Sequence, residues 1–205
     1  MMKLQRAGVV AMLLIGLGGC ATAPPKDPEN ICNIFTEHRS WYQAAVKTRD
    51  KWGVPLHVPM AMMYQESMFK HNAAPPMQYF LGFIPTGRAS TAYGYAQALT
   101  TTWGDYQQET GNRWGERDNF ADAHDFMGWY IAKSHQLNGV SKWDAYRQYL
   151  NYHEGWGGYR RGTHQNKTWL LQTSARVDAR AKRYASQLQG CEQALARGWF
   201  SRLFS

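Results

Sequence analysis

Apolar residues recur at helical spacing along most of the chain. A first apolar series runs from Asn30 to Trp52 and stops before Gly53, a residue type common just past a helix end. The same periodicity, with capping residues and glycine stops, predicts five further helices: Val58 to Asn72, Thr100 to Thr110, Asp118 to Leu137, Ser141 to about Asn151, and Thr168 to Leu188. No alternating pattern of useful strand length and no internal repeat is present. The sequence therefore predicts an all-α fold.

Two segments between these helices lack the helical pattern. Residues 73–92 are rich in proline, glycine and aromatic residues, and they directly follow the second predicted helix. A loop of this length either forms a wall or lid of a binding groove or packs down on the domain, and we favour the groove wall. Residues 152–162 are rich in glycine and aromatic residues, so we expect a second loop there.

The composition fits one globular domain with a basic surface. The chain has 205 residues, of which 44% are hydrophobic and 19% charged, and its formal charge is +8. No zinc-finger spacing or basic-region heptad accompanies the charge, so no nucleic-acid partner is predicted. An anionic polymer or membrane suits the charge, and a merely solvated basic surface is the alternative. Nine Trp and twelve Tyr also suit sugars, whose faces stack on aromatic rings.

The N-terminus has the pattern of a bacterial export signal. Lys3 and Arg6 precede an apolar run over residues 7–17, which is too short to span a bilayer comfortably. The run leads into Leu-Gly-Gly-Cys, which resembles the lipoprotein cleavage box, so we expect removal of residues 1–19 and lipidation of Cys20. Ordinary secretion with cleavage after Ala23 is the alternative, although Pro24 directly after that site argues against it.

Short segments flank the predicted domain of residues 31–193. Residues 20–30 contain three prolines and are predicted to form a polar tether. By resemblance to sorted lipoproteins, Ala21 rather than Asp after the lipidated residue favours the outer membrane, with the domain in the periplasm. Residues 194–205 form an amphipathic tail with aromatic and arginine side chains, which either lies on a membrane or docks on the domain.

Two cysteines, Cys32 and Cys191, remain after the predicted cleavage. Because the periplasm is oxidising, we expect them to form a disulfide between the start and the end of the domain. Two unpaired buried thiols are the alternative. So few thiols do not favour a metal site.

Glu66 is the candidate catalytic residue. In the predicted helix it shares a stripe with Met62 and Phe69, and burial among apolar side chains raises the pKa of a carboxyl group. A raised pKa suits a general acid that works near neutral pH. Lys70 lies four residues further on, so a surface salt bridge in the favourable order is the alternative interpretation.

Three motifs follow one another along the chain. They are Glu66-Ser67, then Ala-Tyr-Gly-Tyr-Ala-Gln at residues 92–97, then Asn-Tyr-His-Glu-Gly at residues 151–155. In this order they resemble the lysozyme-like lytic transglycosylases of the soluble-lytic-transglycosylase (SLT) type, whose patterns are Glu-Ser, Ala-x-Gly-Leu-Met-Gln and Ala-Tyr-Asn-x-Gly. The resemblance covers roughly residues 54–158. It implies a single lysozyme-like helical domain with a groove-type active site.

The resemblance assigns roles position by position. It makes Glu66 the single catalytic acid and base, and it places Tyr152 close to the catalytic carboxyl. It implies substrate contacts for six residues: Ser67, Gly94, Tyr95, Gln97, Tyr152 and His153. The chain departs from the pattern where Tyr95 and the next residue replace Leu-Met and where His153 replaces Asn, so subsite details differ. Glu154 occupies a variable position and is expected to be a surface carboxylate.

The family reaction is cleavage of the β-1,4 bond between N-acetylmuramic acid and N-acetylglucosamine. The resemblance implies that the substrate's N-acetyl group stabilises the positive charge and that the muramic C6 hydroxyl closes a 1,6-anhydro ring. It implies no metal or cofactor, and its partner is the glycan strand of peptidoglycan. A lysozyme-type hydrolase is the alternative enzyme, although no second carboxylate is clearly assigned. A non-catalytic peptidoglycan-binding lipoprotein is the alternative outside enzymes.

Overall fold

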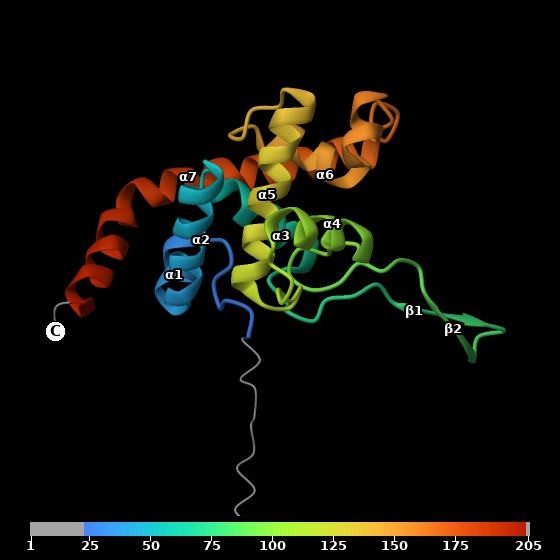
Figure 1. Ribbon diagram of the computed structural model, residues 1–205, viewed down its shortest axis with the longest axis horizontal. Helices are drawn as coiled ribbons and strands as arrows, with labels where there is room; N and C mark the ends of the chain where they lie inside the picture. The colour runs from blue at the N-terminus through green and yellow to red at the C-terminus, as the bar shows by residue number, and fades with distance from the viewer. Residues whose placement is uncertain (1–22, 204–205) are drawn as a thin grey trace, which may run out of the picture.

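The computed structural model describes residues 23–203, with side chains described through residue 197. Within this range the chain forms seven helices and one two-stranded sheet (Figure 1). The helices are α1 (Ile31–Glu37), α2 (Arg39–Trp52), α3 (His57–Ser67), α4 (Thr100–Thr110), α5 (Phe120–Asn138), α6 (Ala145–Arg160) and α7 (Thr168–Leu203). The strands are β1 (Met77–Phe80) and β2 (Ile84–Arg88). The predicted all-α class is confirmed, with one small sheet added.

The predicted export signal, the lipidated Cys20 and the last two residues of the predicted tail lie outside the described residues. Cleavage, lipidation and membrane location therefore stay predictions. Among the described helices, none combines the length and the apolar content that crossing a bilayer requires.

The core lies around α5. This helix packs against α2, α3 and α6, while α7 packs against α1, α3 and α6. Between α2 and the start of α5, the rings of Trp41 and Phe120 stack with their centroids 3.9 Å apart, and Tyr95 meets both rings edge-on. Burying these large rings removes much apolar surface from water. The cluster therefore fixes the loop that carries Tyr95 against the helices.

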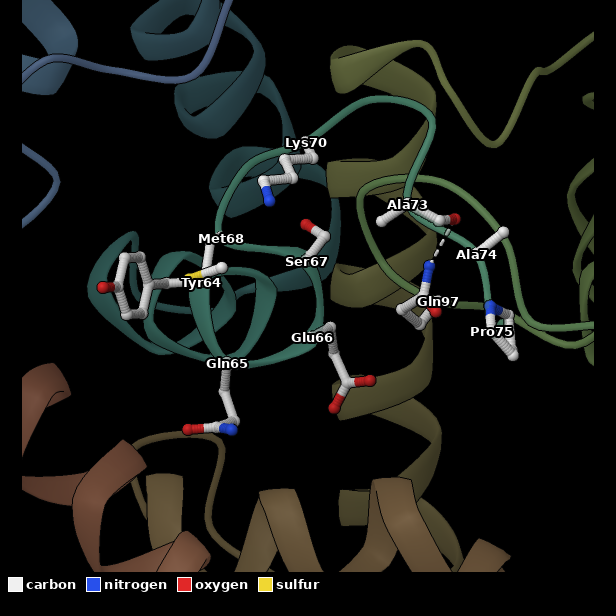
Figure 2. A pocket seen from close by; sticks show the side chains of 10 residues that line it. All are labelled: Tyr64, Gln65, Glu66, Ser67, Met68, Lys70, Ala73, Ala74, Pro75 and Gln97. Carbon is white, nitrogen blue, oxygen red and sulfur yellow. Dashed lines mark hydrogen bonds between the residues drawn. The ribbon is translucent and has the colours of Figure 1, made fainter. Parts of the chain in front are cut away.

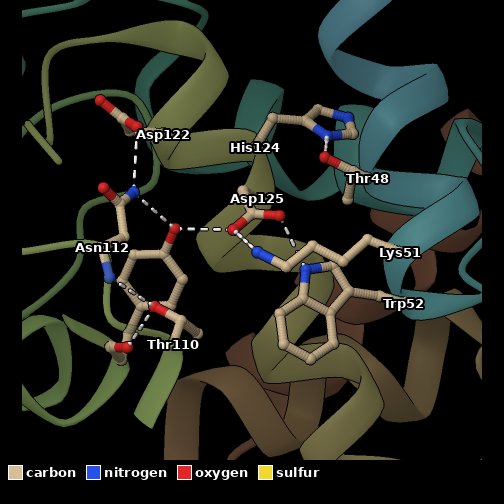
Figure 3. Close-up of polar contacts among 9 residues, drawn as sticks. Thr48, Lys51, Trp52, Thr110, Asn112, Asp122, His124 and Asp125 are labelled. Atoms are coloured by element: carbon tan, nitrogen blue, oxygen red, sulfur yellow. Dashed lines mark hydrogen bonds and ion pairs between the residues drawn. The ribbon is translucent and has the colours of Figure 1, made fainter. Parts of the chain in front are cut away.

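A polar network joins α2, α4 and α5 (Figure 3). Asp125 of α5 lies at its centre and binds three side chains at 2.7–2.8 Å: Lys51 and Trp52 of α2 and Tyr106 of α4. In the preceding position, buried His124 bonds to Thr48 of α2 at 3.0 Å. Because polar groups inside a protein are costly unless they are paired, these contacts fix three helices in one arrangement.

The first predicted helix is in fact two helices. α1 begins after Asn30, whose side chain accepts hydrogen bonds from backbone N–H groups of the first turn. His38 then has φ −115° and ψ 74°, which is outside the helical region, so the chain changes direction before α2. Cys32 of α1 forms a disulfide with Cys191 of α7, which confirms the expected pairing.

α3 ends at Ser67 rather than at Asn72. Met68 and Phe69 both have positive φ, 52° and 59°, and a left-handed residue at this position ends a helix. Phe69 is fully buried in the core instead of lying on a helical stripe. Lys70 therefore lies outside the helix, and the helical i,i+4 geometry of a salt bridge with Glu66 does not exist.

Residues 73–92 contain a β-hairpin that the sequence did not predict. β1 and β2 pair antiparallel, with Met77 opposite Arg88, and the turn at Leu81 and Gly82 has positive φ. Almost every residue of both strands is exposed, so the segment lacks the alternation that marks a half-buried strand. The hairpin projects beyond the helices at the right of Figure 1. The alternative in which this whole segment packs down on the domain is therefore wrong.

The boundaries of α5 and α6 also differ from prediction. Asn119 rather than Asp118 caps α5, since its side chain accepts from two backbone N–H groups of the first turn. Asp144 caps α6, which continues to Arg160 through residues that were expected to form a loop. Gly155, at φ 70°, interrupts the helix without ending it.

α7 continues the predicted helix of residues 168–188 to Leu203, so the predicted tail extends this helix. Leu195 is buried, so the start of the tail packs on the domain. The chain before α1 also lies against α7: Glu29 pairs with Arg180 at 2.6 Å, and the Tyr184 hydroxyl donates to the Pro28 carbonyl. The described part of the predicted tether is thus held against the helical body.

Candidate active site

A pocket of about 530 Å³ opens where α3 ends. Three segments line it: the last turn of α3 with the residues just after it, residues 73–75 before the hairpin, and Gln97 of the second motif. Figure 2 shows the Glu66 side chain extending from the end of α3 into this space, with Gln97 and Pro75 on the facing side. The first two sequence motifs therefore meet at one cavity.

Glu66 has the environment of a proton donor. Its neighbours Met62 and Met63 are fully buried, and its own side chain is partly buried at the floor of the pocket. Burial raises the pKa of Glu66 to about 7, against the lowering effect of a hydrogen bond from the Tyr149 hydroxyl. Near neutral pH Glu66 is therefore present in both its protonated and its ionised form. The expected burial and raised pKa of this carboxyl are both present.

Tyr149 is the residue at this site that the sequence analysis missed. It lies on α6, is 5% exposed and donates its hydroxyl to the Glu66 carboxyl group. Burial raises the pKa of Tyr149, and the nearby charge of Glu66 raises it further, so the phenol stays protonated and remains a donor. Its spacing of three residues from Tyr152 places both on one face of α6. That spacing was readable from the sequence, although the partner was not.

Tyr152 lies near Glu66 but donates its hydroxyl elsewhere. Burial and then the charge of Glu66 raise the pKa of Tyr152, which shows that the two groups are close. Its hydroxyl donates to the backbone carbonyl of Ala96, in the loop that carries Gln97. Tyr152 thus ties the second motif to α6 beside the acid.

Ser67 and Tyr95 join the end of α3 to the loop of the second motif. The buried Ser67 hydroxyl lies 2.7 Å from the Tyr95 carbonyl and 3.2 Å from the Met63 carbonyl. The Tyr95 side chain is 1% exposed and packs between Trp41 and Phe120. The substrate contact expected of Tyr95 is therefore corrected, because its ring belongs to the core.

Gly94 and Gln97 shape the loop opposite Glu66. Gly94 has φ 77°, and a Cβ there would lie 2.0 Å from the Arg117 carbonyl oxygen, so only glycine fits. The Gln97 side-chain amide donates to the carbonyls of Ala73 (2.7 Å) and Gly94 (3.0 Å). This pair of bonds holds Gln97 rigidly at the pocket wall and leaves its side-chain oxygen as an acceptor.

His153 and Glu154 lie apart from this pocket. His153 is exposed, bonds to Glu154 at 3.0 Å and meets the ring of Trp169 edge-on. The Glu154 side chain is only 4% exposed and pairs with Lys167 at 2.7 Å. Burial acts to raise the pKa of Glu154, but hydrogen bonds from Lys167, Thr163 and His153 outweigh it and lower this pKa to about 2. The expectation of a surface carboxylate is wrong for Glu154, which holds the loop between α6 and α7.

Acidic groups are otherwise scarce at the pocket. Within the described part of the chain, Glu66 is the only carboxylate among the residues that line it. The residues described also contain no group of three or more His, Cys, Asp or Glu side chains placed to hold a metal ion. The pocket therefore combines the carboxyl group of Glu66, the Tyr149 hydroxyl that donates to it, and the side-chain amide of Gln97 on the opposite wall.

Comparison with known protein families gives a match over most of the chain. A family model described as a transglycosylase SLT domain matches residues 8–191. No curated protein and no solved structure shows a significant match to the chain.

Proposed function

We propose a reaction for this pocket from one premise: the chain belongs to the transglycosylase SLT domain family, whose model covers most of its length. That membership makes the fold lysozyme-like and the function a lytic-transglycosylase type of peptidoglycan processing. The bond that is cleaved, the residue that cleaves it and the place where this occurs are our proposals.

The proposed reaction breaks the β-1,4 bond between N-acetylmuramic acid and N-acetylglucosamine. Protonated Glu66 gives its proton to the glycosidic oxygen, and the bond from muramic C1 to that oxygen breaks. The substrate's own N-acetyl carbonyl stabilises the positive charge at C1. Glu66, now an anion, takes the proton of the muramic C6 hydroxyl, and the C6 oxygen bonds to C1. The products are a free N-acetylglucosamine hydroxyl and a 1,6-anhydro end, with no water consumed.

One observation carries this proposal. The pocket has a single carboxylate, and burial raises its pKa to about 7, so the same group serves first as acid and then as base. A hydrolase of the two-carboxylate kind needs a second acidic group across the bond. Glu154, the carboxylate of the third motif, is paired with Lys167 and does not line the pocket.

The residues around Glu66 then have distinct roles. Tyr149 orients the carboxyl and stabilises the anion after proton transfer, because its hydroxyl donates to that group. The Gln97 side-chain oxygen accepts a hydrogen bond from a sugar hydroxyl, while its amide is held by Ala73 and Gly94. Tyr152 and Ser67 act indirectly, by fixing the loop of residues 94–97 at the correct distance from the acid.

A digest of purified peptidoglycan tests the reaction. Residues 23–205 are incubated with it beside Glu66→Gln, and the muropeptides are read by mass spectrometry. Glu116→Gln is the matched control, because Glu116 is an exposed carboxylate outside the pocket. We expect anhydro-ended products from the parent and the control only. Reducing ends from the parent would make the protein a hydrolase, and equal products from Glu66→Gln would remove Glu66 from the mechanism.

We further propose that the mature protein is anchored through a lipidated Cys20 to the periplasmic face of the outer membrane. The support is the Leu-Gly-Gly-Cys box after a short apolar run, with Ala21 following. Mass spectrometry of the N-terminal peptide of the membrane-extracted protein tests it. We expect an acylated Cys20 at the first position. An unmodified N-terminus at Pro24 would instead establish ordinary secretion.

A further inference from the structure

The hairpin presents a concentrated apolar surface. Of the twelve exposed large apolar side chains in the described residues, six belong to it: Met77, Tyr79, Phe80, Leu81, Phe83 and Ile84. The tip residues Leu81 and Phe83 are 70% and 71% exposed. From Met77 to Gly87 there is no charged residue. Exposed apolar clusters of this kind mark a surface that another body covers.

The helical body does not provide that cover. β1 and β2 make their main contacts with each other, and the hairpin extends away from the helices (Figure 1). Only its base is tied to the pocket: the Arg88 guanidinium donates to the carbonyl of Pro75, which lines the cavity. The hairpin is therefore a separate projection, anchored next to the active site.

The chemistry of the tip favours lipid over sugar. Sugar sites place hydrogen-bonding side chains around an aromatic ring. Here the tip mixes aromatic with aliphatic side chains, and the Thr86 hydroxyl is used internally, because it donates to the Gln78 carbonyl at 3.1 Å. Aromatic and aliphatic side chains without polar partners suit the boundary between lipid headgroups and acyl chains. The outer strand edges, whose backbone groups need water or headgroups, exclude a deeper position.

The start of the described chain places a membrane within reach. Pro25 is already buried, and the next residues bond to the body, as the Lys26 N–H does to Glu37 at 3.1 Å. Pro25 lies five residues after Cys20, and a fully extended chain covers roughly 17 Å over that distance. A lipid on Cys20 would therefore hold the domain close against the bilayer surface. The positive charge of the chain adds attraction to anionic lipids.

We propose that the hairpin tip, residues 79–84, inserts into the headgroup boundary of a phospholipid membrane and forms a second attachment beside the lipidated N-terminus. This goes beyond the proposed reaction and relies on the proposed anchor only for its place in the cell. Two attachments would fix the orientation of the domain on the membrane. Because residues 73–75 join the hairpin to the pocket, they would also fix the height at which the pocket meets a glycan strand.

Vesicle flotation tests the hairpin without the lipid anchor. The protein is residues 23–205, which contain every element, the core and the disulfide of the described structure. The vesicles are phosphatidylethanolamine with phosphatidylglycerol. The test variant combines Phe80→Ser, Leu81→Ser and Phe83→Ser, and the control combines Trp114→Ser with Trp143→Ser, two exposed positions outside the hairpin. Circular dichroism confirms that each variant is folded.

We expect the parent and the control to float with the vesicles and the hairpin variant to bind at least about tenfold more weakly. Four results would overturn the proposal. The first is a parent that does not bind, and the second is a hairpin variant that binds equally well. The third is a loss of cleavage of membrane-free peptidoglycan in the hairpin variant, which would assign the hairpin to the glycan groove. The fourth is a parent dimer that the hairpin substitutions dissociate, which would make a second copy the occupant.

Flotation of Glu66→Gln keeps this test separate from the reaction. We expect that variant to bind vesicles as the parent does, because Glu66 lies in the pocket and not in the hairpin. A parent that binds membranes but cleaves nothing would therefore contradict the proposed reaction alone.

Discussion

Replacing Glu66 by Gln is expected to stabilise the protein at alkaline pH and to leave its stability in acid nearly unchanged. Burial raises the pKa of Glu66 from 4.5 to about 7 in the folded state. The folded protein therefore binds this proton more tightly than the unfolded chain does. The resulting contribution to stability is fully present below pH 4.5 and is lost as the pH rises through 7.

The size of the effect follows from the two pKa values. The difference between about 7 and 4.5, at about 1.4 kcal/mol per pH unit, gives roughly 3 kcal/mol of unfolding free energy. The glutamine side chain of the variant would be neutral at every pH, so the variant escapes this loss. Above pH 8 we expect the variant to be about 3 kcal/mol more stable than the parent, which for a chain of this length raises Tm by roughly 6–12 °C.

Urea unfolding followed by tryptophan fluorescence, at several pH values from 4 to 9, measures the difference directly. Glu116→Gln makes the same chemical change at an exposed position outside the pocket and is the matched control. A stability difference between Glu66→Gln and the parent that stays constant from acid to alkaline pH would refute the reasoning. It would mean that Glu66 is not a carboxyl with a raised pKa.

Three further substitutions test separate parts of the structure. Tyr149→Phe removes a hydrogen bond that lowers the pKa of Glu66, so the alkaline limb of the pH–rate profile should shift to higher pH and kcat should fall about tenfold. An unchanged profile would contradict the positioning role of Tyr149. Gly94→Ala puts a Cβ against the Arg117 carbonyl and should lower the unfolding free energy by about 2 kcal/mol or more in urea titrations. The control is Gly104→Ala on α4, which should be neutral or stabilising because the space around Gly104 is open. Glu154→Gln should destabilise the protein at pH 7, because the pKa of Glu154 is lowered to about 2 in the folded state. The stability that this carboxylate contributes is present above pH 4.5 and is lost as the pH falls through 2. Thermal unfolding at pH 7 and pH 3 should therefore show the stability difference between variant and parent shrinking in acid, opposite in direction to Glu66→Gln.

Helix stops were predictable where a glycine provides them. Gly53, Gly111 and Gly139 each adopt a left-handed conformation just past a helix, as their positions indicated. The end of α3 was not predictable, because the left-handed residues there are Met68 and Phe69. The burial of the Phe69 side chain offsets the backbone strain of these two residues. That burial depends on the tertiary structure and not on the local sequence.

The hairpin and the second half of α6 are regular structure in segments that were expected to form loops. Strand prediction relies on one buried and one exposed face, and the hairpin has almost no buried residue. Gly155 was expected to lie in a loop, but the chain resumes a helical course after it. Local composition indicated irregular backbone at both places without indicating its form.

The site was predictable as a set of positions but not as a set of contacts. The motifs named Glu66 and Gln97, which line one cavity, and Gly94, which shapes the loop that carries Gln97. They could not show that Tyr95 points into the aromatic core or that Tyr149 bonds to the acid. Both facts depend on how α6 and the loop of residues 92–98 pack against α3, which no local pattern encodes.

The most direct test of the central claim is a peptidoglycan digest by residues 23–205 in water labelled with the heavy oxygen isotope, read by mass spectrometry. Intramolecular attack by the muramic C6 hydroxyl predicts anhydro-ended products that contain no label, and no products from Glu66→Gln. Labelled reducing ends would contradict the account, because they would show that water, and not the substrate's own hydroxyl, completes the reaction.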